Sequence, residues 1–169
     1  MCIRDSPYTV YASLDGVPPQ NEYDVSKGFT YLYFKGIPLY SFGHGLSYTR
    51  FEYSDLSLST LVVRPSGQVT VSFNLKNVGD RAGSDTPQLY THGQHSGGPV
   101  QPIESLRAFE RVTLDPGQTR RISMSLPAER LAGYDVPSHS FKVEPGIFDI
   151  LVGSASDDIR LRAQFSVSR

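Results

Sequence analysis

The chain has 169 residues and a formal net charge of −1, and its charged side chains are scattered singly rather than gathered in a basic stripe. The length suits one domain of ordinary size with some additional chain, and the charge pattern argues against a nucleic-acid partner. No apolar run approaches the roughly 20 residues that cross a bilayer, so we expect no membrane partner.

The chain begins with "MCIRDSP", which lacks the apolar stretch of a secretory signal peptide. This stretch fits poorly with the residues after it, and we interpret residues 1–6 as a non-native or disordered leader. The only cysteine, Cys2, lies in this leader. No disulfide can form within the chain, and cysteine usage does not indicate the cellular compartment.

Residues 7–50 are rich in aromatic side chains: 12 of the 19 in the chain fall between Tyr8 and Tyr53. The segment "FTYLYF", residues 29–34, is apolar on both faces, as in a strand of a sheet that helices cover on both sides. We therefore interpret residues 7–50 as the end of an α/β domain followed by an interdomain linker. The alternative is that residues 29–34 fold back as one more strand of the next domain.

The linker contains "PLYSFGHGLSYT", residues 38–49. Its two glycines, Gly43 and Gly45, permit a sharp bend of the backbone. We expect its large side chains to be buried in the joint with a neighbouring domain: Tyr40, Phe42, Leu46 and Tyr48.

Apolar and polar residues alternate in several segments after residue 51. The inward sets are Val69, Val71, Phe73 and Leu75; Ile122, Met124 and Leu126; Phe148, Ile150 and Val152; and Ile159, Leu161, Ala163, Phe165 and Val167. A period of two is typical of strands with one buried face, and two such sheets stack into a sandwich. We predict an all-β, immunoglobulin-like or fibronectin type III-like sandwich of seven or eight strands in residues 51–169.

Turn residues separate these segments. "DPGQ" (115–118) and "EPGI" (144–147) have Pro before Gly, as type II turns do, and "PAERLAG" (127–133) is compatible with one helical turn. In "LRAFERVTL" (106–114) the alternation slips by one residue. A β-bulge in that strand is expected to bring Phe109 inward.

Two pairs of carboxylates are candidates for acid–base chemistry. Asp157 and Asp158 are adjacent in a tight strand connection, where Asp is an ordinary turn former. Glu22 and Asp24 are two residues apart and could share a face, although a solvated loop is the simpler interpretation. We therefore assign no catalytic residue.

The histidines do not predict a metal site. His92 and His95 are three residues apart in a glycine-rich stretch, without a further ligand at the usual spacing. His44 lies between two glycines, where a packing or hydrogen-bonding role is expected. Since the chain also has no phosphate-binding or dinucleotide motif, we expect no metal and no cofactor.

The segment "PPQNEYDVSKGFTYLYFKGIPLYSFGHGLSYTRFEY" resembles the stretch of glycoside hydrolase family 3 enzymes that leaves the second, α/β-sandwich domain and enters the C-terminal domain. "SLRAFERVTLDPGQ", "LAGYDV" and "FKVEPGIFDILVGSASDDIRL" resemble that family's fibronectin type III-like domain, in the same order. Three positions depart from the family pattern: Ser41 replaces Pro, His44 replaces an aromatic residue, and Phe29 replaces Arg. These departures weaken any inference about the sugar specificity of the enzyme.

The resemblance implies that the parent enzyme is a retaining β-glycosidase, with an Asp nucleophile on an N-terminal barrel and an acid/base residue on the second domain. No residue of this chain matches those motifs, so the resemblance implies a C-terminal structural domain that is inactive alone and supports the barrel and α/β domains. The resemblance further implies that the linker loop, with Glu22 and Asp24 before it, lies near the sugar pocket and the oligosaccharide substrate of the intact enzyme. A periplasmic or secreted bacterial parent is compatible with the resemblance. The alternative is an independent module that binds glycans or surfaces, against which stand the absence of Trp and the inward position of the strand aromatics.

Overall fold

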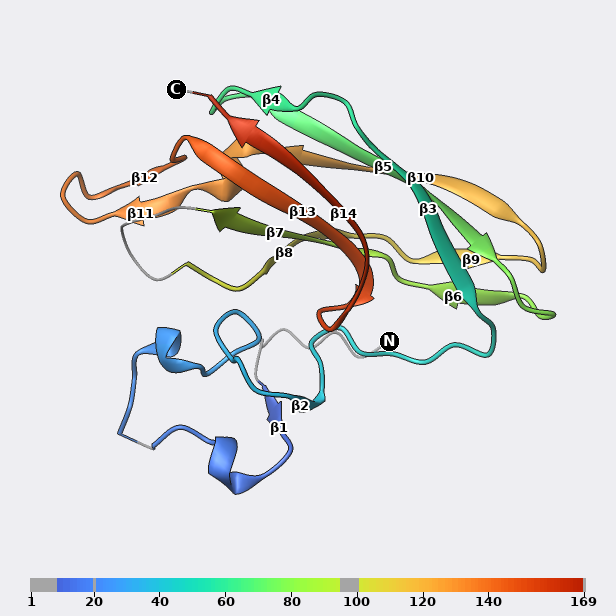
Figure 1. The fold of residues 1–169 in the computed structure, drawn as a ribbon, viewed down its shortest axis with the longest axis horizontal. Helices are drawn as coiled ribbons and strands as arrows, with labels where there is room; N and C mark the ends of the chain where they lie inside the picture. The colour runs from blue at the N-terminus through green and yellow to red at the C-terminus, as the bar shows by residue number, and fades with distance from the viewer. Residues whose placement is uncertain (1–8, 20, 95–100, 169) are drawn as a thin grey trace.

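The computed structural model describes residues 9–19, 21–94 and 101–168, which form two stacked sheets with a smaller N-terminal lobe beside one end (Figure 1). The predicted leader, residues 1–6, lies outside the described residues. We call residues 9–19 and 21–50 the lobe and the part from residue 51 onward the sandwich.

The sandwich contains a three-stranded and a five-stranded sheet. The first has the order β10–β5–β3, formed by β3 (Phe51–Leu58), β5 (Gln68–Asn77) and β10 (Thr119–Pro127). The second has the order β4–β14–β13–β7–β8, formed by β4 (Val62–Val63), β7 (Gln88–Gln94), β8 (Ser105–Phe109), β13 (Gly146–Ala155) and β14 (Asp158–Val167). Neighbouring strands are antiparallel except β4 and β14, which are parallel. The strands of these two sheets confirm the predicted all-β sandwich.

Shorter elements complete the described chain. The strand pairs are β1 (Val10–Tyr11) with β2 (Pro38–Tyr40), β6 (Gly83–Asp85) with β9 (Val112–Leu114), and β11 (Gly133–Asp135) with β12 (Ser140–Lys142). The helical turns are η1 (Leu14–Gly16), η2 (Val25–Lys27) and η3 (Ala128–Leu131), and η3 is the turn predicted in "PAERLAG". Within the described ranges, no helix has the length and hydrophobicity that crossing a membrane requires.

The core lies between the two sheets and uses the predicted faces. On β5, β10, β13 and β14 the buried set includes Val69, Val71, Phe73, Leu75, Ile122, Met124, Leu126, Phe148, Ile150, Val152, Phe165 and Val167. Ile159, Leu161 and Ala163 are half-buried. The rings of Tyr53 and Phe73 stack with centroids 5.8 Å apart, which joins β3 to β5 within the core. Burial of these apolar faces drives the stacking of the sheets.

Two local predictions need correction. The register between β7 and β8 slips as predicted, but Ala108 takes the position packed on the core and Phe109 remains 55% exposed. One inserted residue, Arg107, shifts the parity so that Ala108 and not Phe109 points inward. Gly117 has the positive φ (+74°) expected of its turn. Gly146 in "EPGI" also has a positive φ (+159°), but it is the first residue of β13 and does not form the predicted type II turn.

The predicted strand at residues 29–34 is wrong, and the alternative that it joins the sandwich as a strand is wrong as well. After η2, Gly28 adopts φ +101°, and the N–H groups of Tyr33 and Phe34 both donate to the carbonyl of Thr30 at 2.9 and 2.7 Å. The segment therefore folds into turns. Local hydrogen bonds satisfy backbone groups that a strand would leave for a ladder partner.

Candidate functional site

Glu22 and Asp24 are brought together, but both are used by the local backbone. A Glu22 carboxylate oxygen accepts from the N–H of Asp24 at 3.0 Å, and Asp24 caps η2 by accepting from the N–H (3.0 Å) and hydroxyl (2.6 Å) of Ser26. The hydrogen bond from the Ser26 side chain lowers the pKa of Asp24. A carboxyl with a lowered pKa is ionised at neutral pH and is a poor general acid.

Glu22 also lines an open hollow of about 500 Å³ in the lobe, with Tyr33, Phe34, Lys27 and Lys35 among its other walls. The hollow combines aromatic and charged groups and is large enough for a sugar ring. Asp24 is not among its lining residues.

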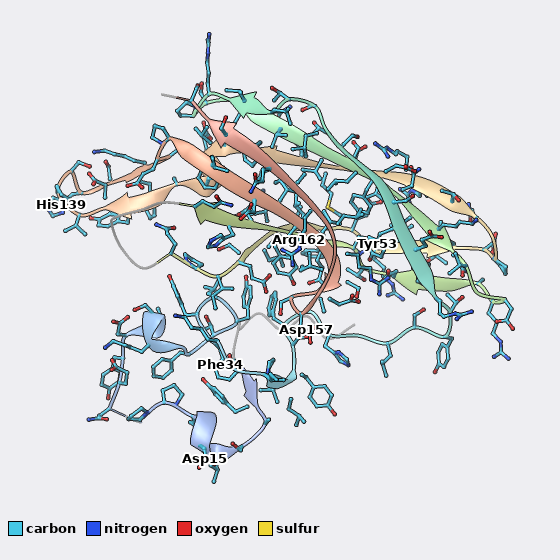
Figure 2. All side chains as sticks on the ribbon, viewed as in Figure 1. Asp15, Phe34, Tyr53, His139, Asp157 and Arg162 are labelled. Atoms are coloured by element: carbon cyan, nitrogen blue, oxygen red, sulfur yellow. The ribbon has the colours of Figure 1, made fainter. Side chains whose placement is uncertain are left out.

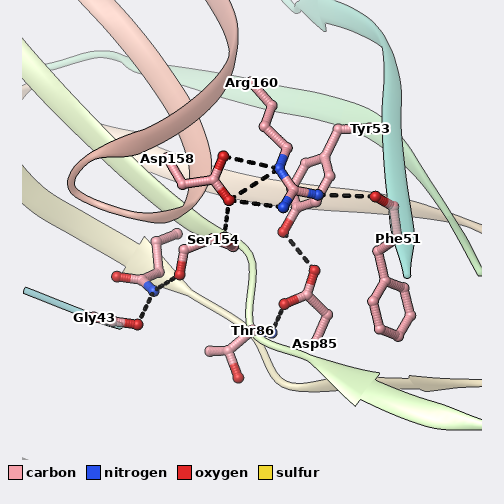
Figure 3. Close-up of polar contacts among 9 residues, drawn as sticks. Gly43, Phe51, Tyr53, Asp85, Thr86, Ser154, Asp158 and Arg160 are labelled. Carbon is pink, nitrogen blue, oxygen red and sulfur yellow. Dashed lines mark hydrogen bonds and ion pairs between the residues drawn. The ribbon is translucent and has the colours of Figure 1, made fainter. Parts of the chain in front are cut away.

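Asp157 lies in the turn between β13 and β14, and Asp158 is the first residue of β14, so the two side chains have separate surroundings. Asp158 accepts from the Arg160 guanidinium at 2.7 Å and from the Ser154 hydroxyl at 2.5 Å (Figure 3). The Arg160 hydrogen bond lowers the pKa of Asp158. Asp157 lies on the side of the turn that faces the lobe (Figure 2).

Arg160 continues this network into the other sheet. It donates to the carbonyl of Phe51 at 2.8 Å, and its guanidinium lies 4.9 Å from the ring centre of Tyr53. The Tyr53 hydroxyl donates to Asp85 at 2.8 Å, and burial raises the pKa of this phenol (Figure 3). These contacts tie β14, β3 and β6 together, which is a structural role for Asp158.

His44 and His92 lie in different parts of the structure. The ring of His44 is tilted against that of Tyr40 with centroids 5.4 Å apart, and His92 lies in β7, where its Nδ1 is 2.9 Å from the carbonyl oxygen of Pro102. His95 and Cys2 lie outside the described residues. Over residues 9–19, 21–94 and 101–168, no group of three or more His, Cys, Asp or Glu side chains could hold a metal ion.

The best-organised polar arrangement is the junction between lobe and sandwich. Gln88 of β7 is 5% exposed, and its amide donates to the carbonyls of Gly43 (3.2 Å) and Ser154 (2.5 Å) while accepting from the Tyr90 hydroxyl (2.6 Å). Gly43 adopts φ +80°, and a Cβ there would lie 2.2 Å from the Gln88 side-chain oxygen. The bend predicted at Gly43 is therefore present, and its carbonyl is held by the sandwich.

Aromatic stacking and backbone hydrogen bonds strengthen this junction. The rings of Tyr31 and Phe42 are stacked with centroids 4.0 Å apart, and Tyr31 packs edge-on to Tyr90 at 6.2 Å. The Tyr31 hydroxyl accepts from the N–H of Leu106 at 3.1 Å. The carbonyl of Phe42 accepts from the N–H of Ser156 at 2.9 Å.

The other three side chains that were expected to be buried in the joint are exposed. Tyr40 is 56% exposed, whereas Leu46 and Tyr48 are each 94% exposed. Only Phe42 of the four packs against the junction between lobe and sandwich. Ser41 is buried next to it, and its hydroxyl has no hydrogen-bond partner among the described residues.

Sequence reasoning missed Glu104, the carboxyl with the most unusual surroundings in the described chain. It is 8% exposed, and burial raises its pKa to about 7 against the opposing effects of a hydrogen bond with Ser156 and the charge of Arg162. Glu104 is two residues before Leu106, and this spacing was a signal that both side chains could lie on one face of the strand. The residues that interact with Glu104 come from the lobe and from other strands of the sandwich, and alternation alone does not reveal them.

Comparison with known proteins connects these features to a family. The family model described as "Fibronectin type III-like domain" matches residues 85–156. "Thermostable beta-glucosidase B" of Acetivibrio thermocellus is 40% identical over 142 residues, which are 83% of this chain and 19% of that protein. A "Putative beta-xylosidase" of Formosa agariphila is 31% identical over 91% of this chain and 20% of its own length.

Solved structures agree with these relatives. The beta-D-glucoside glucohydrolase of Trichoderma reesei superimposes with a TM-score of 0.81 at 30% identity, over 95% of this chain and 26% of that chain. The chain spans about a fifth of the length of the curated relatives it matches, so in them this region is one part of a larger enzyme. With its sandwich and its order of motifs, the chain belongs to glycoside hydrolase family 3, as the C-terminal region and chiefly the fibronectin type III-like domain of such an enzyme.

Proposed function

We propose that this chain is the non-catalytic structural domain of a longer β-glycosidase that hydrolyses terminal β-linked sugars. Retaining hydrolysis needs two carboxyl groups about 5–5.5 Å apart across the scissile bond. The observation that carries the proposal is the use of Asp24 and Asp158 in local hydrogen bonds that lower their pKa, in a chain that spans a fifth of enzymes such as the Acetivibrio β-glucosidase.

We further propose that the exposed side chains of Tyr40, Leu46 and Tyr48 form the docking face for the barrel and α/β-sandwich domains of the parent. Fully burying a large apolar side chain stabilises a contact by about 1.5–3 kcal/mol. In this proposal residues 7–50 are the end of the α/β domain and the linker, and residues 51–169 are the supporting domain. Phe42 of the linker stacks on Tyr31, and Tyr31 in turn contacts Tyr90 and the N–H of Leu106, which links the position of the linker to the sandwich.

An assay of the chain alone on nitrophenyl β-glucoside and β-xyloside tests the absence of catalysis. We expect no turnover above a control without protein. Turnover that is lost in Glu22→Gln or Asp24→Asn would overturn the proposal, because it would place the chemistry in this chain.

The hollow beside Glu22 favours a second role, contact between the lobe and an oligosaccharide. Titration calorimetry with xylan and cello-oligosaccharides tests it, with Tyr33→Ala as the variant that removes an aromatic wall. Micromolar binding that is lost in this variant would favour an independent glycan-binding module. Heats of dilution alone would exclude that role for the isolated chain.

A further inference from the structure

Glu104 lies between two backbone contacts that hold the lobe on the sandwich. The residue before it, Ile103, donates its N–H to the carbonyl of Leu32 at 2.6 Å. The Glu104 carboxyl itself is hydrogen-bonded to the Ser156 side chain, and the N–H of Ser156 donates to the carbonyl of Phe42 at 2.9 Å. A change at this buried carboxyl therefore acts on residues that contact the lobe at two points.

Ionisable groups from the lobe, β7, the β13–β14 turn and β14 interact electrostatically with this carboxyl. They are Tyr31 from the lobe, Tyr90 from β7, Asp157 from the β13–β14 turn and Arg162 from β14, with Arg107 on the strand after Glu104 and close to Tyr31. Arg162 favours the carboxylate, whereas Asp157 disfavours it. Burial outweighs both, because a charge shielded from water has lost most of its hydration.

We propose that protonation of Glu104 controls the docking of lobe residues 31–42 onto the sandwich, so that the neutral carboxyl holds the lobe in place and the carboxylate loosens it. Such control of the junction goes beyond the proposed supporting role of the chain and does not depend on the activity of the longer protein.

The direction of the pH effect is set by linkage. The pKa of Glu104 is about 7 in the docked state, above the ordinary value of 4.5 expected when the lobe is released and the carboxyl is solvated. A raised pKa stabilises docking fully below the ordinary value, and this stabilisation is lost as the pH rises toward 7. Release of the lobe should increase by about tenfold per pH unit between roughly 5 and 7 and level off above that.

Hydrogen exchange of the complete 169-residue chain, followed by NMR at pH 5, 6, 7 and 8, measures this release. Protection factors, already corrected for the intrinsic pH dependence of exchange, are read at the N–H groups of Ile103 and Ser156. The Phe73 N–H in the core serves as the internal reference. We expect the first two protection factors to fall by about tenfold per unit from pH 5 to 7, while that of Phe73 does not follow them.

Glu104→Gln keeps the shape of the side chain without its charge and should hold both protection factors high at every pH. The matched control is Glu110→Gln, which removes an exposed carboxylate paired with Arg120 at 2.8 Å and should leave the wild-type dependence intact. A fall in protection that persists in Glu104→Gln would overturn the proposal.

A direct titration keeps the test valid even if the variant folds poorly. The side-chain ¹³C resonance of Glu104 in the wild-type chain should titrate with a midpoint near 7. A midpoint near the ordinary value of 4.5 would refute the proposal without any substitution. Neither result bears on whether the chain hydrolyses glycosides, so the two proposals fail separately.

Discussion

The side-chain amide of Gln88 holds the backbone carbonyl of Gly43 at 3.2 Å, although the two residues are 45 positions apart in the chain. The same amide donates to the carbonyl of Ser154 and accepts from the hydroxyl of Tyr90. One buried glutamine thus joins the linker, the end of β13 and β7. Both polar atoms of its side chain have partners, which is what burial of an amide requires.

Replacing this amide should weaken the junction. Gln88→Leu leaves the Gly43 and Ser154 carbonyls and the Tyr90 hydroxyl without their partner, and an unsatisfied buried polar group costs about 1–3 kcal/mol. We expect urea denaturation to show a loss of that size. Gln94→Ala on the same strand, whose amide binds Asp149 at an exposed site, should change stability by less than about 0.5 kcal/mol. Equal effects of the two changes would show that the Gln88 contacts add nothing.

The two glycines of the linker should differ in their tolerance of a side chain. Gly43→Ala forces φ +80° on a residue with a Cβ and places that atom 2.2 Å from the Gln88 side chain, so we expect a loss of about 1–3 kcal/mol. Gly45→Ala meets no atom within 4 Å and should be nearly neutral. Thermal unfolding of the pair of variants gives the comparison. A neutral Gly43→Ala would mean that the linker can bend in another way.

The core assignment predicts a larger effect within the sandwich. Phe73 is fully buried and stacks on Tyr53, so Phe73→Ala should cost about 3–5 kcal/mol through the cavity that it leaves. Phe141→Ala in β12 removes a ring that is 74% exposed and serves as the control. Normal urea stability of Phe73→Ala would indicate that the buried and exposed faces of β5 are reversed.

The proposed docking face should respond differently from the junction. Replacing Leu46 and Tyr48, each 94% exposed, by Ser should improve the solubility of the isolated chain and leave its melting temperature unchanged. Phe42→Ser removes the ring stacked on Tyr31 and should lower the melting temperature. Sedimentation and thermal unfolding measure the two effects. If Leu46 and Tyr48 contribute to stability in the isolated chain, they belong to its own packing and the docking face lies elsewhere.

The sequence predicted the sandwich because alternation along a strand is a local property. Successive side chains of β5 point to opposite faces whatever the rest of the chain does, so Val71 and Phe73 could be placed inward from their spacing alone. The same reasoning failed at Phe109, because a single inserted residue in β8 exchanges the two faces beyond it. It failed again at residues 29–34, where apolar composition was interpreted as a buried strand but the backbone closes into turns.

The carboxylates also show that local features could be predicted from the sequence and long-range contacts could not. A local structural role for Asp158 was expected from its place in a tight strand connection, and its partners Ser154 and Arg160 lie within four residues of it. The environment of Glu104 was not accessible, because the groups that interact with it include Tyr31 and Ser156, which lie far from it in the chain. Local order can be inferred from spacing, whereas the pKa of a carboxyl depends on which distant residues exclude water from it.

By itself, the sequence determined the all-β architecture and the inward face of each long strand, since period-two burial and turn residues act over a few neighbouring positions. Only the tertiary structure decided how the N-terminal segment folds, that Gln88 forms the hydrogen bond to the linker, and that Glu104 is the carboxyl buried at the junction. Those features arise from contacts between residues tens of positions apart, such as Phe42 with Ser156. These contacts stabilise the fold only after the lobe has packed on the sandwich, so no short stretch of sequence indicates them.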